Sequence, residues 1–211
     1  MEEKLTYSQV KNFLLCLASQ VLQSKDELNR MDAECGDGDF GTSMFIAFTK
    51  LQRAVQATLG DDISRLLIDG GQAILSSAGG AAGPIFGILF TEAGKASKGK
   101  KELGVSDLAE MFEVALVKIK ARGGARLGDK TLVDALEPAV ISLKKSAADN
   151  AFLERALADA AEAARKGFEG TKALVARRGK AMYLAEQTVG HLDPGARVTM
   201  LLFERFHNEA K

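Results

Sequence analysis

The chain has 211 residues, of which 28 are basic and 28 acidic, so its formal net charge is zero. A balanced charge argues against a nucleic-acid-binding surface and against attraction to an anionic membrane. With 46% hydrophobic and 27% charged residues, the composition is ordinary for a globular protein. Two cysteines make no disulfide framework, no apolar run is long enough to span a membrane, and the N-terminus lacks a signal-peptide pattern. We therefore expect a cytoplasmic protein with neither nucleic acid nor membrane as a partner.

Apolar residues recur at helical spacing along the whole chain, and alternating β-type runs are absent. Residues 6–9 resemble a capping box before a first helix, and Asp62 is a candidate N-cap for the third. Further helices are expected from about Thr42, at 85–96 after Pro84, and from Asp107. Three more are expected at 131–147 with a candidate bend at Pro138, at 150–166, and at 171–187 with a candidate break at Gly179. Asp193-Pro194 opens the last helix. This pattern predicts one all-α domain, residues 1–211, of about eight antiparallel helices.

Three aspartates, Asp32, Asp37 and Asp39, lie within eight residues and among glycines. Residues two apart do not share a helix face, so Asp37 and Asp39 can converge only from a loop. Converging carboxylates repel one another unless a cation neutralises them, and an all-oxygen set suits Mg²⁺, which often shares its ligands with substrate phosphates. A solvated turn is the alternative. An EF-hand is excluded because Phe48 stands where the twelfth-position acidic ligand is needed.

Most glycines gather between the expected helices, in clusters at 36–41, 79–83, 123–128 and 190–195. Four such loops at one end of a bundle would let backbone amides approach a phosphate closely. The segment 76–84, Ser-Ser-Ala-Gly-Gly-Ala-Ala-Gly-Pro, is the best candidate, because it leads into a helix N-terminus whose dipole favours anions. Close helix packing through small residues explains this segment equally well.

Residues 123–131 are not a P-loop, because Asp129 separates the last glycine from Lys130 and no strand precedes them. Lys130 can reach a phosphate or an acidic neighbour, and Asp129 can cap the next helix, but structural roles fit both equally well. His191 is expected to be hydrogen-bonded to backbone, and no second histidine stands at zinc-ligand spacing. Cys35 is expected to be a small filler rather than a nucleophile, because its acidic neighbours disfavour the thiolate.

Four motifs in this order resemble the nucleotide-binding L subunit of dihydroxyacetone kinase, which also occurs as the second domain of single-chain kinases. They are Asp32-x4-Asp37-Gly-Asp39-x-Gly41, the segment 76–84, Gly128-Asp-Lys-Thr131 and Gly190-His-Leu-Asp-Pro-Gly-Ala196. The resemblance spans essentially the whole chain. It implies an antiparallel eight-helix barrel that holds ADP or ATP and two Mg²⁺ ions at one end.

The resemblance also implies the roles of individual residues. Asp32, Asp37 and Asp39 would bind magnesium. Lys180, at a position where the family often has arginine, would be catalytic and would stabilise phosphoryl charge without the bidentate fork of arginine. The phosphates would be bordered by Phe40, Gly41, Thr42 and Ser43, and the nucleotide would be lined by Ala81 and Ala82. The adenine would be flanked by Gly123 and Leu132, and the site would be closed by Asp193, Pro194 and Gly195.

The same family passes phosphate to dihydroxyacetone held on a separate K subunit, so the resemblance implies a subunit that works only with that partner. Two donors stay open, ATP itself or a phosphocarrier M subunit that rephosphorylates bound ADP. Phe40 stands where subunits served by the sugar phosphotransferase system often have histidine, and Thr42-Ser43 replaces their commoner Leu-Asn. A kinase subunit for another ketose such as erythrulose, or a non-catalytic nucleotide-loaded regulatory module, are the alternatives.

Overall fold

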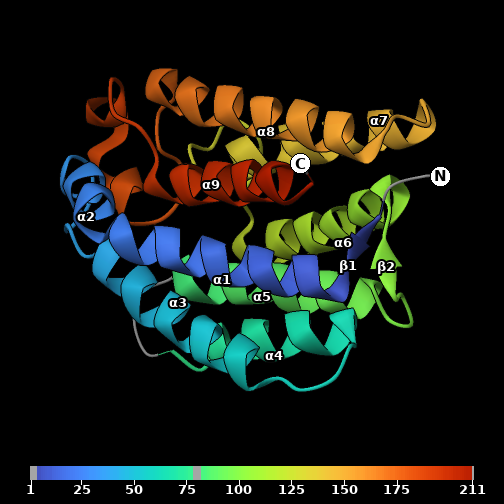
Figure 1. The fold of residues 1–211 in the computed structure, drawn as a ribbon. Helices are drawn as coiled ribbons and strands as arrows, with labels where there is room; N and C mark the ends of the chain where they lie inside the picture. The colour runs from blue at the N-terminus through green and yellow to red at the C-terminus, as the bar shows by residue number, and fades with distance from the viewer. Residues whose placement is uncertain (1–3, 78–81, 211) are drawn as a thin grey trace.

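The structure is a computed structural model that describes residues 4–77 and 82–210. Within these ranges, eight long helices form a closed ring in which each packs against the next and the last returns to the first (Figure 1). The ring consists of α1 (Tyr7–Gln23), α3 (Phe40–Ala57), α4 (Ile63–Leu75), α5 (Ala82–Ala96), α6 (Val105–Gly123), α7 (Val133–Ala148), α8 (Leu153–Gly170) and α9 (Pro194–Glu209). The all-α prediction is confirmed.

A short α-helix and two short strands accompany the ring, together with two 3₁₀ helices between α8 and α9. The short helix α2 (Lys25–Ala33) connects α1 to α3 and packs against α3. The strands β1 (Leu5–Thr6) and β2 (Glu102–Leu103) form a two-residue antiparallel ladder, with Leu5 opposite Leu103. None of the helices in the described part of the chain combines the length and hydropathy that a membrane span requires.

Three helices begin at the caps that the sequence predicts. Thr6 accepts a hydrogen bond from the Gln9 backbone N–H, and the Gln9 side chain accepts one from the Thr6 backbone, which closes the capping box of α1. Asp62 caps α4, and Asp193 caps α9 with a 2.7 Å bond from the Ala196 N–H. These capping residues therefore determine where three helices of the ring begin.

Aromatic side chains close the ring where α9 meets α1 and α6. The ring of Phe13 on α1 stacks on that of Phe206 on α9 with centroids 3.6 Å apart, and Phe112 on α6 meets Phe206 edge-on at 5.7 Å. All three side chains are buried. Such pairs add to the hydrophobic stabilisation of the core, so the interior is a packed core rather than a channel.

The structure corrects two expectations about local structure. Helix α2 was not predicted, because Leu28 is its only buried residue and an apolar stripe is missing. The α-helix predicted over 171–187 is wrong: this segment contains only the 3₁₀ helices η1 (Thr171–Ala173) and η2 (Lys180–Thr188). Gly179 at φ +69° and Ala185 at φ +46° adopt backbone conformations that an α-helix does not allow.

Candidate active site

A pocket of about 500 Å³ opens at the end of the ring where α3 and α9 begin and α6 ends. Its wall draws on three of the four glycine-rich loops, through the acidic loop at 32–40, the turn after α6 and the start of α9. Residues 78–81 of the fourth loop lie outside the described residues, and Pro84, which follows on α5, also lines the pocket. The predicted convergence at one end of the bundle is therefore observed for three of the four loops.

The three aspartates of the acidic loop converge at the mouth of this pocket. Asp32, Asp37 and Asp39 each offer a carboxylate oxygen, and these oxygens lie within 4.8 Å of one another. The loop folds back on its own first aspartate, because Asp32 accepts hydrogen bonds from the backbone N–H groups of Asp39, at 3.0 Å, and Phe40, at 3.2 Å. A Cβ at Gly36 would lie 2.5 Å from the Asp32 carboxylate, so a larger residue there would displace this carboxylate.

The electrostatics of this cluster fit a bound cation. Burial raises the pKa of Asp32, and the neighbouring Asp37 raises it further, against three backbone hydrogen bonds that lower it. The hydrogen bond from Lys180 lowers the pKa of Asp37. Three carboxylates with so little positive charge between them form a hard oxygen set, which is the kind that Mg²⁺ prefers. Asp32, Asp37 and Asp39 would therefore hold this metal.

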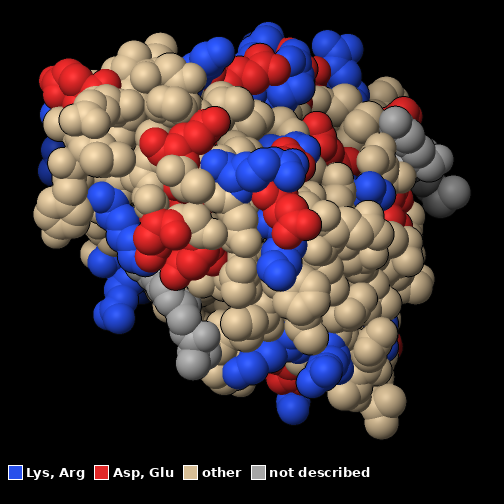
Figure 2. All heavy atoms as spheres, turned by 90° about the vertical axis from the view of Figure 1, so that its left-hand side faces the viewer, with Lys and Arg blue, Asp and Glu red and all other residues tan. Residues whose placement is uncertain are grey.

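Lys180 reaches the carboxylates from the segment between α8 and α9. Its ammonium pairs with Asp37 and lies 3.7 Å from the carboxylate of Asp39. Figure 2 views this end of the molecule and shows acidic and basic side chains interspersed over it. An exposed lysine beside the predicted metal ligands can also meet the phosphates that the metal would bind.

Behind the carboxylates the pocket wall is apolar. Five side chains of this wall are not among the predicted site residues: Ile85, Phe86, Ile119, Ala125 and Leu192. Their apolar character marks them equally well as core residues. The one available signal was the position of Ile85 and Phe86 directly after Pro84 in the predicted phosphate loop. A flat ring system would fit such a wall, with charged groups kept at the mouth.

The predicted nucleotide-binding residues divide into three groups. Those that line the pocket are Phe40, Ser43, Gly123, Leu132, Lys180, Asp193, Pro194 and Gly195. Gly41 and Thr42 face α2 instead: a Cβ at Gly41 would lie 2.0 Å from the Lys25 carbonyl oxygen, and the Thr42 N–H donates to Asn29 at 3.0 Å. Ala81 and the side chain of Ala82 lie outside the described residues, while the Ala82 backbone begins α5.

Asp193 has an unusual environment at the base of the pocket. Part of its surface opens to the pocket, yet protein encloses the carboxyl, and this burial raises its pKa to about 7. The nearby Asp134 raises the pKa as well, while Lys130 and the hydrogen bond from the Ala196 N–H lower it. Asp193 is therefore a carboxyl that titrates near neutral pH.

Three further expectations are corrected or refined. Asp129 does not cap α7: it accepts from the Arg126 N–H and pairs with Arg178 at 3.3 Å, while Asp134 accepts from the Gly128 and Thr131 N–H groups. His191 uses its Nδ1 to contact a Glu34 carboxylate oxygen at 3.0 Å rather than backbone. Cys35 lines the pocket, and burial, more than its acidic neighbours, raises the pKa of its thiol.

Lys130 does not point into the pocket mouth toward the carboxylates. Its side chain is buried, with 4% of the residue exposed, and its ammonium donates to backbone carbonyls. Burial lowers its pKa. Of the two roles considered from the sequence, the structure shows the structural one.

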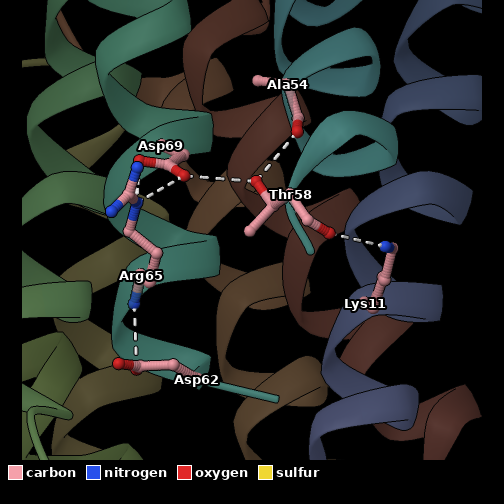
Figure 3. A network of polar contacts seen from close by, with 6 residues as sticks. All are labelled: Lys11, Ala54, Thr58, Asp62, Arg65 and Asp69. Carbon is pink, nitrogen blue, oxygen red and sulfur yellow. Dashed lines mark hydrogen bonds and ion pairs between the residues drawn. The ribbon is translucent and has the colours of Figure 1, made fainter. Parts of the chain in front are cut away.

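A larger but shallow groove, of about 710 Å³, lies at the far end of α3. Figure 3 shows the polar network beside it, which centres on Thr58. The Thr58 carbonyl accepts a hydrogen bond from Lys11 at 3.1 Å, and the Thr58 hydroxyl lies 2.9 Å from the Ala54 carbonyl oxygen and 3.3 Å from the Asp69 carboxylate. Asp69 also pairs with Arg65. This network ties α1, α3 and α4 together. Among the described residues the one carboxylate cluster that could hold a metal lies at the opposite end, so the smaller pocket is the candidate active site.

Comparison with known proteins shows the family of this chain. Residues 34–208 match the model of the DAK2 domain. The chain is 34% identical over 207 residues to the ADP-binding subunit DhaL of the PEP-dependent dihydroxyacetone kinase of Escherichia coli, covering 98% of this chain and 99% of that one. It is 34% identical over 190 residues to the ADP-binding subunit DhaL of PEP-dependent dihydroxyacetone kinase 2 of Listeria innocua, covering 88% and 87% of the two chains.

The fold of this chain also occurs in a solved structure. The crystal structure of the dihydroxyacetone kinase of C. freundii in complex with AMP-PNP and Mg²⁺ matches with a TM-score of 0.73 and 25% identity. The match covers 99% of this chain and 35% of that kinase chain, so this chain corresponds to about a third of it. The fold is that of the helical domain of such kinases. The chain belongs to the DAK2-domain family.

Proposed function

We propose that this chain is the nucleotide-binding, phosphoryl-transferring subunit of a dihydroxyacetone kinase. The observation that carries the proposal is the convergence of Asp32, Asp37 and Asp39 opposite Lys180, at the mouth of a pocket with an apolar wall. Relatives that share nearly the whole length of this chain are named as ADP-binding subunits of such kinases, which supports the same assignment.

In this proposal the nucleotide enters the pocket with its base against the apolar wall. Gly123 and Leu132 flank the adenine, and Asp193, Pro194 and Gly195 close the site beside it. The phosphates lie toward Phe40 and Ser43 at the start of α3, where the positive end of the helix dipole favours anions. Gly41, Thr42, Ala81 and Ala82 complete the proposed set as neighbours of the phosphates and the nucleotide.

Phosphoryl transfer depends on positioning and charge neutralisation more than on covalent chemistry of the protein. Magnesium bound to the three aspartates, two ions in the family pattern, would neutralise phosphate charge. Asp32 is oriented for this by the Asp39 and Phe40 N–H groups. Lys180 donates to the phosphoryl group in transfer, and its exposed position next to Asp37 lets it follow that charge.

The acceptor ketose would be held by a separate K subunit that docks over the pocket mouth. Apolar side chains exposed beside Lys180 support such docking: Tyr183 is 81% exposed, Met182 44% and Leu184 36%. Large apolar side chains grouped at the surface commonly mark a contact with another protein. We place this assembly in the cytoplasm, where ADP and ATP are abundant.

The relatives that match this chain over most of their length also indicate the phosphate donor. These are named as PEP-dependent or PTS-dependent kinases with an ADP-binding subunit, which favours tightly held ADP that a phosphocarrier M subunit rephosphorylates. Phe40 and the pair Thr42-Ser43 differ from the residues common in that group, so direct use of ATP is the competing donor. Native mass spectrometry of the purified chain separates the two, since retained ADP is expected only for the first.

A reconstitution experiment tests the function itself. The purified chain with Mg²⁺, ATP and dihydroxyacetone should give no phosphorylated ketone. Phosphorylated ketone should form once a K subunit is added, with ATP alone if ATP is the donor, or only with the phosphocarrier system present if bound ADP is rephosphorylated. Turnover without any K subunit would refute the dependence on a partner. Nucleotide binding with no transfer to any K subunit would support a regulatory module instead.

Erythrulose is the second candidate acceptor. The L-erythrulose 1-kinase of Mycolicibacterium smegmatis is 36% identical over 174 residues, although this chain covers only 30% of it. The K subunit holds the ketose, so the acceptor should be set by that subunit. Supplying both ketoses with K subunits of each kind would show whether this chain serves one partner or both.

A further inference from the structure

We propose that Lys130 is a positioning residue that holds the Lys180 segment, residues 171–191, in the conformation needed for phosphoryl transfer. The inference rests on the proposed function only for the role of Lys180. The juxtaposition that carries it is one buried ammonium bound to backbone carbonyls from both ends of this segment.

The Lys130 ammonium lies at the base of the segment and joins its two ends. It is 2.8 Å from the Thr171 carbonyl oxygen and 3.2 Å from that of Leu174, both just after α8. It is also 2.8 Å from the Thr188 carbonyl oxygen and 2.5 Å from that of His191, both just before α9. A single side chain therefore closes a loop of the chain that carries Lys180 at its middle.

A lysine is the residue that such a junction requires. Its ammonium offers three N–H donors and no acceptor, and all four groups around it are acceptors. A buried charge is costly unless it is hydrogen-bonded, and buried carbonyls are costly when unpaired, so three N–H groups shared among four carbonyl oxygens stabilise both sides. The position at the C-terminus of α8 adds the favourable end of the helix dipole.

Neighbouring contacts hold the same segment at further points. The carbonyl of Asp129 accepts a hydrogen bond from the Arg177 N–H at 3.0 Å, and the carboxylate of Asp129 pairs with Arg178. Two residues shortly before Lys180 are therefore fixed. The Gly190 N–H donates to the Lys172 carbonyl at 2.8 Å and ties the two ends directly. Residues 129 and 130 together thus clamp the segment at its base and on the approach to Lys180.

The segment needs such a clamp because its own backbone does not favour this shape. Ala185 adopts φ +46° and ψ −123°, which is strained for a residue with a side chain. Such a conformation persists only where surrounding contacts determine it. Without the Lys130 ammonium, Lys180 would lose its fixed position opposite Asp37. The apolar nucleotide wall, built on α5, α6 and the start of α9, would remain.

The backbone at Lys130 allows an unusually clean test. Lys130 has φ +60°, a conformation that glycine adopts freely, so Lys130→Gly removes the side chain without adding backbone strain. The deleted atoms correspond to n-butylammonium, which can be added in solution to refill the space. In a second variant, Lys130→Met, the side chain fills the space without a charge, so added amine cannot enter.

Hydrogen exchange of the backbone amides of the segment is the primary measurement. In both variants the amides of Ala176, Arg177 and Gly190 should exchange at least about tenfold faster than in the wild type. Added n-butylammonium should restore protection in Lys130→Gly but not in Lys130→Met, and 1-butanol should restore neither. Amides of Phe13 and Leu14 in α1 report whether each variant is folded.

Activity with a K subunit is the second measurement. In Lys130→Gly, kcat should fall by about 10²-fold, the usual effect of misplacing a reacting group by about 1 Å, and should recover with n-butylammonium. The Kd for ADP should change less than about threefold. Asn150→Gly is the matched control, because Asn150 also has positive φ, at +51°, and lies in an exposed turn between α7 and α8.

Normal protection of the segment in a folded Lys130→Gly or Lys130→Met would overturn the proposal. Lost protection with an unchanged kcat would overturn it as well, because Lys180 would then work without a fixed segment. If the wild type transfers no phosphate with any K subunit, the proposed function fails, while the exchange measurement still decides whether Lys130 orders the segment.

Discussion

Lys180 forms an ion pair with Asp37, a residue 143 positions earlier in the chain, and its ammonium also lies 3.7 Å from the Asp39 carboxylate. This contact joins the segment between α8 and α9 to the acidic loop between α2 and α3. The proposed metal ligands and the proposed charge-stabilising lysine therefore face each other across the pocket mouth, although the sequence separates them widely.

Asp37→Asn should abolish magnesium-dependent binding of ADP. The change replaces one of three converging carboxylates by a neutral amide, which is a much poorer ligand for a hard cation. Titration calorimetry with ADP, with and without Mg²⁺, measures the effect, and circular dichroism should show unchanged helix content. Asp61→Asn, at an exposed carboxylate near the start of α4, is the control and should bind as the wild type does. Unchanged binding in Asp37→Asn would mean that the site is assigned wrongly.

Lys180→Met should lower the rate of phosphoryl transfer by about 10²- to 10³-fold, the usual cost of removing one preorganised donor to transition-state charge. The Kd for ADP should change little, since the interaction is strongest during transfer. Steady-state kinetics with a K subunit give kcat, and calorimetry gives Kd. Lys180→Arg should keep most of the activity, and Lys144→Met, at an exposed lysine on α7, should keep all of it. A Lys180→Met enzyme with normal kcat would remove Lys180 from the mechanism.

Two glycines three residues apart on α8 should respond oppositely to alanine. A Cβ at Gly167 would lie 2.1 Å from the Asp134 carbonyl oxygen of α7, whereas nothing lies within 4 Å of a Cβ at Gly170. Gly167→Ala should therefore lower the free energy of unfolding by about 1–3 kcal/mol or more, as overpacking does. Gly170→Ala should be neutral or stabilising by up to about 1 kcal/mol, because alanine favours helix. Urea denaturation measures both, and equal effects would contradict the close packing of α7 on α8.

Stability should depend on pH through Asp193. Its pKa of about 7 in the folded chain is above its value in the unfolded chain, so the folded state binds more protons between these two values. The contribution of this group is therefore greatest at low pH and declines as pH rises from about 4 to about 7. Asp193→Asn keeps an oxygen to cap α9 and removes this titration.

Urea midpoints of wild type and Asp193→Asn at pH 5, 6, 7 and 8 isolate the effect, because other groups titrate equally in both. The variant should gain stability relative to the wild type up to about pH 7 and then change no further. A constant difference across this range would show that Asp193 is ionised throughout.

Much of the fold follows from short-range sequence signals. The caps at Thr6, Asp62 and Asp193 and the apolar stripes of the long helices need no distant partner, so they are readable from one sequence. Helix α2 was missed because its place depends on packing against α3, including the approach of Gly41 to the Lys25 carbonyl. Close backbone approach leaves no periodic pattern in the sequence.

The site was predictable where charge and glycine gather, and not where long-range contacts decide. Asp32, Asp37 and Asp39 stand together in the sequence, so their convergence was expected. Residues 171–187 have helical composition, yet the carbonyls of this segment bind Lys130, from another part of the chain. The apolar wall was hidden for a different reason, since Ile85 and Phe86 look like core residues in any helix.

A crystal structure of the chain with ADP and Mg²⁺ tests the central claim most directly. The account predicts magnesium about 2.0–2.1 Å from oxygens of Asp32, Asp37 and Asp39, with the nucleotide phosphates as further ligands and the base against Ile85 and Leu132. Carboxylates that bind no metal, or a nucleotide bound outside this pocket, would contradict it.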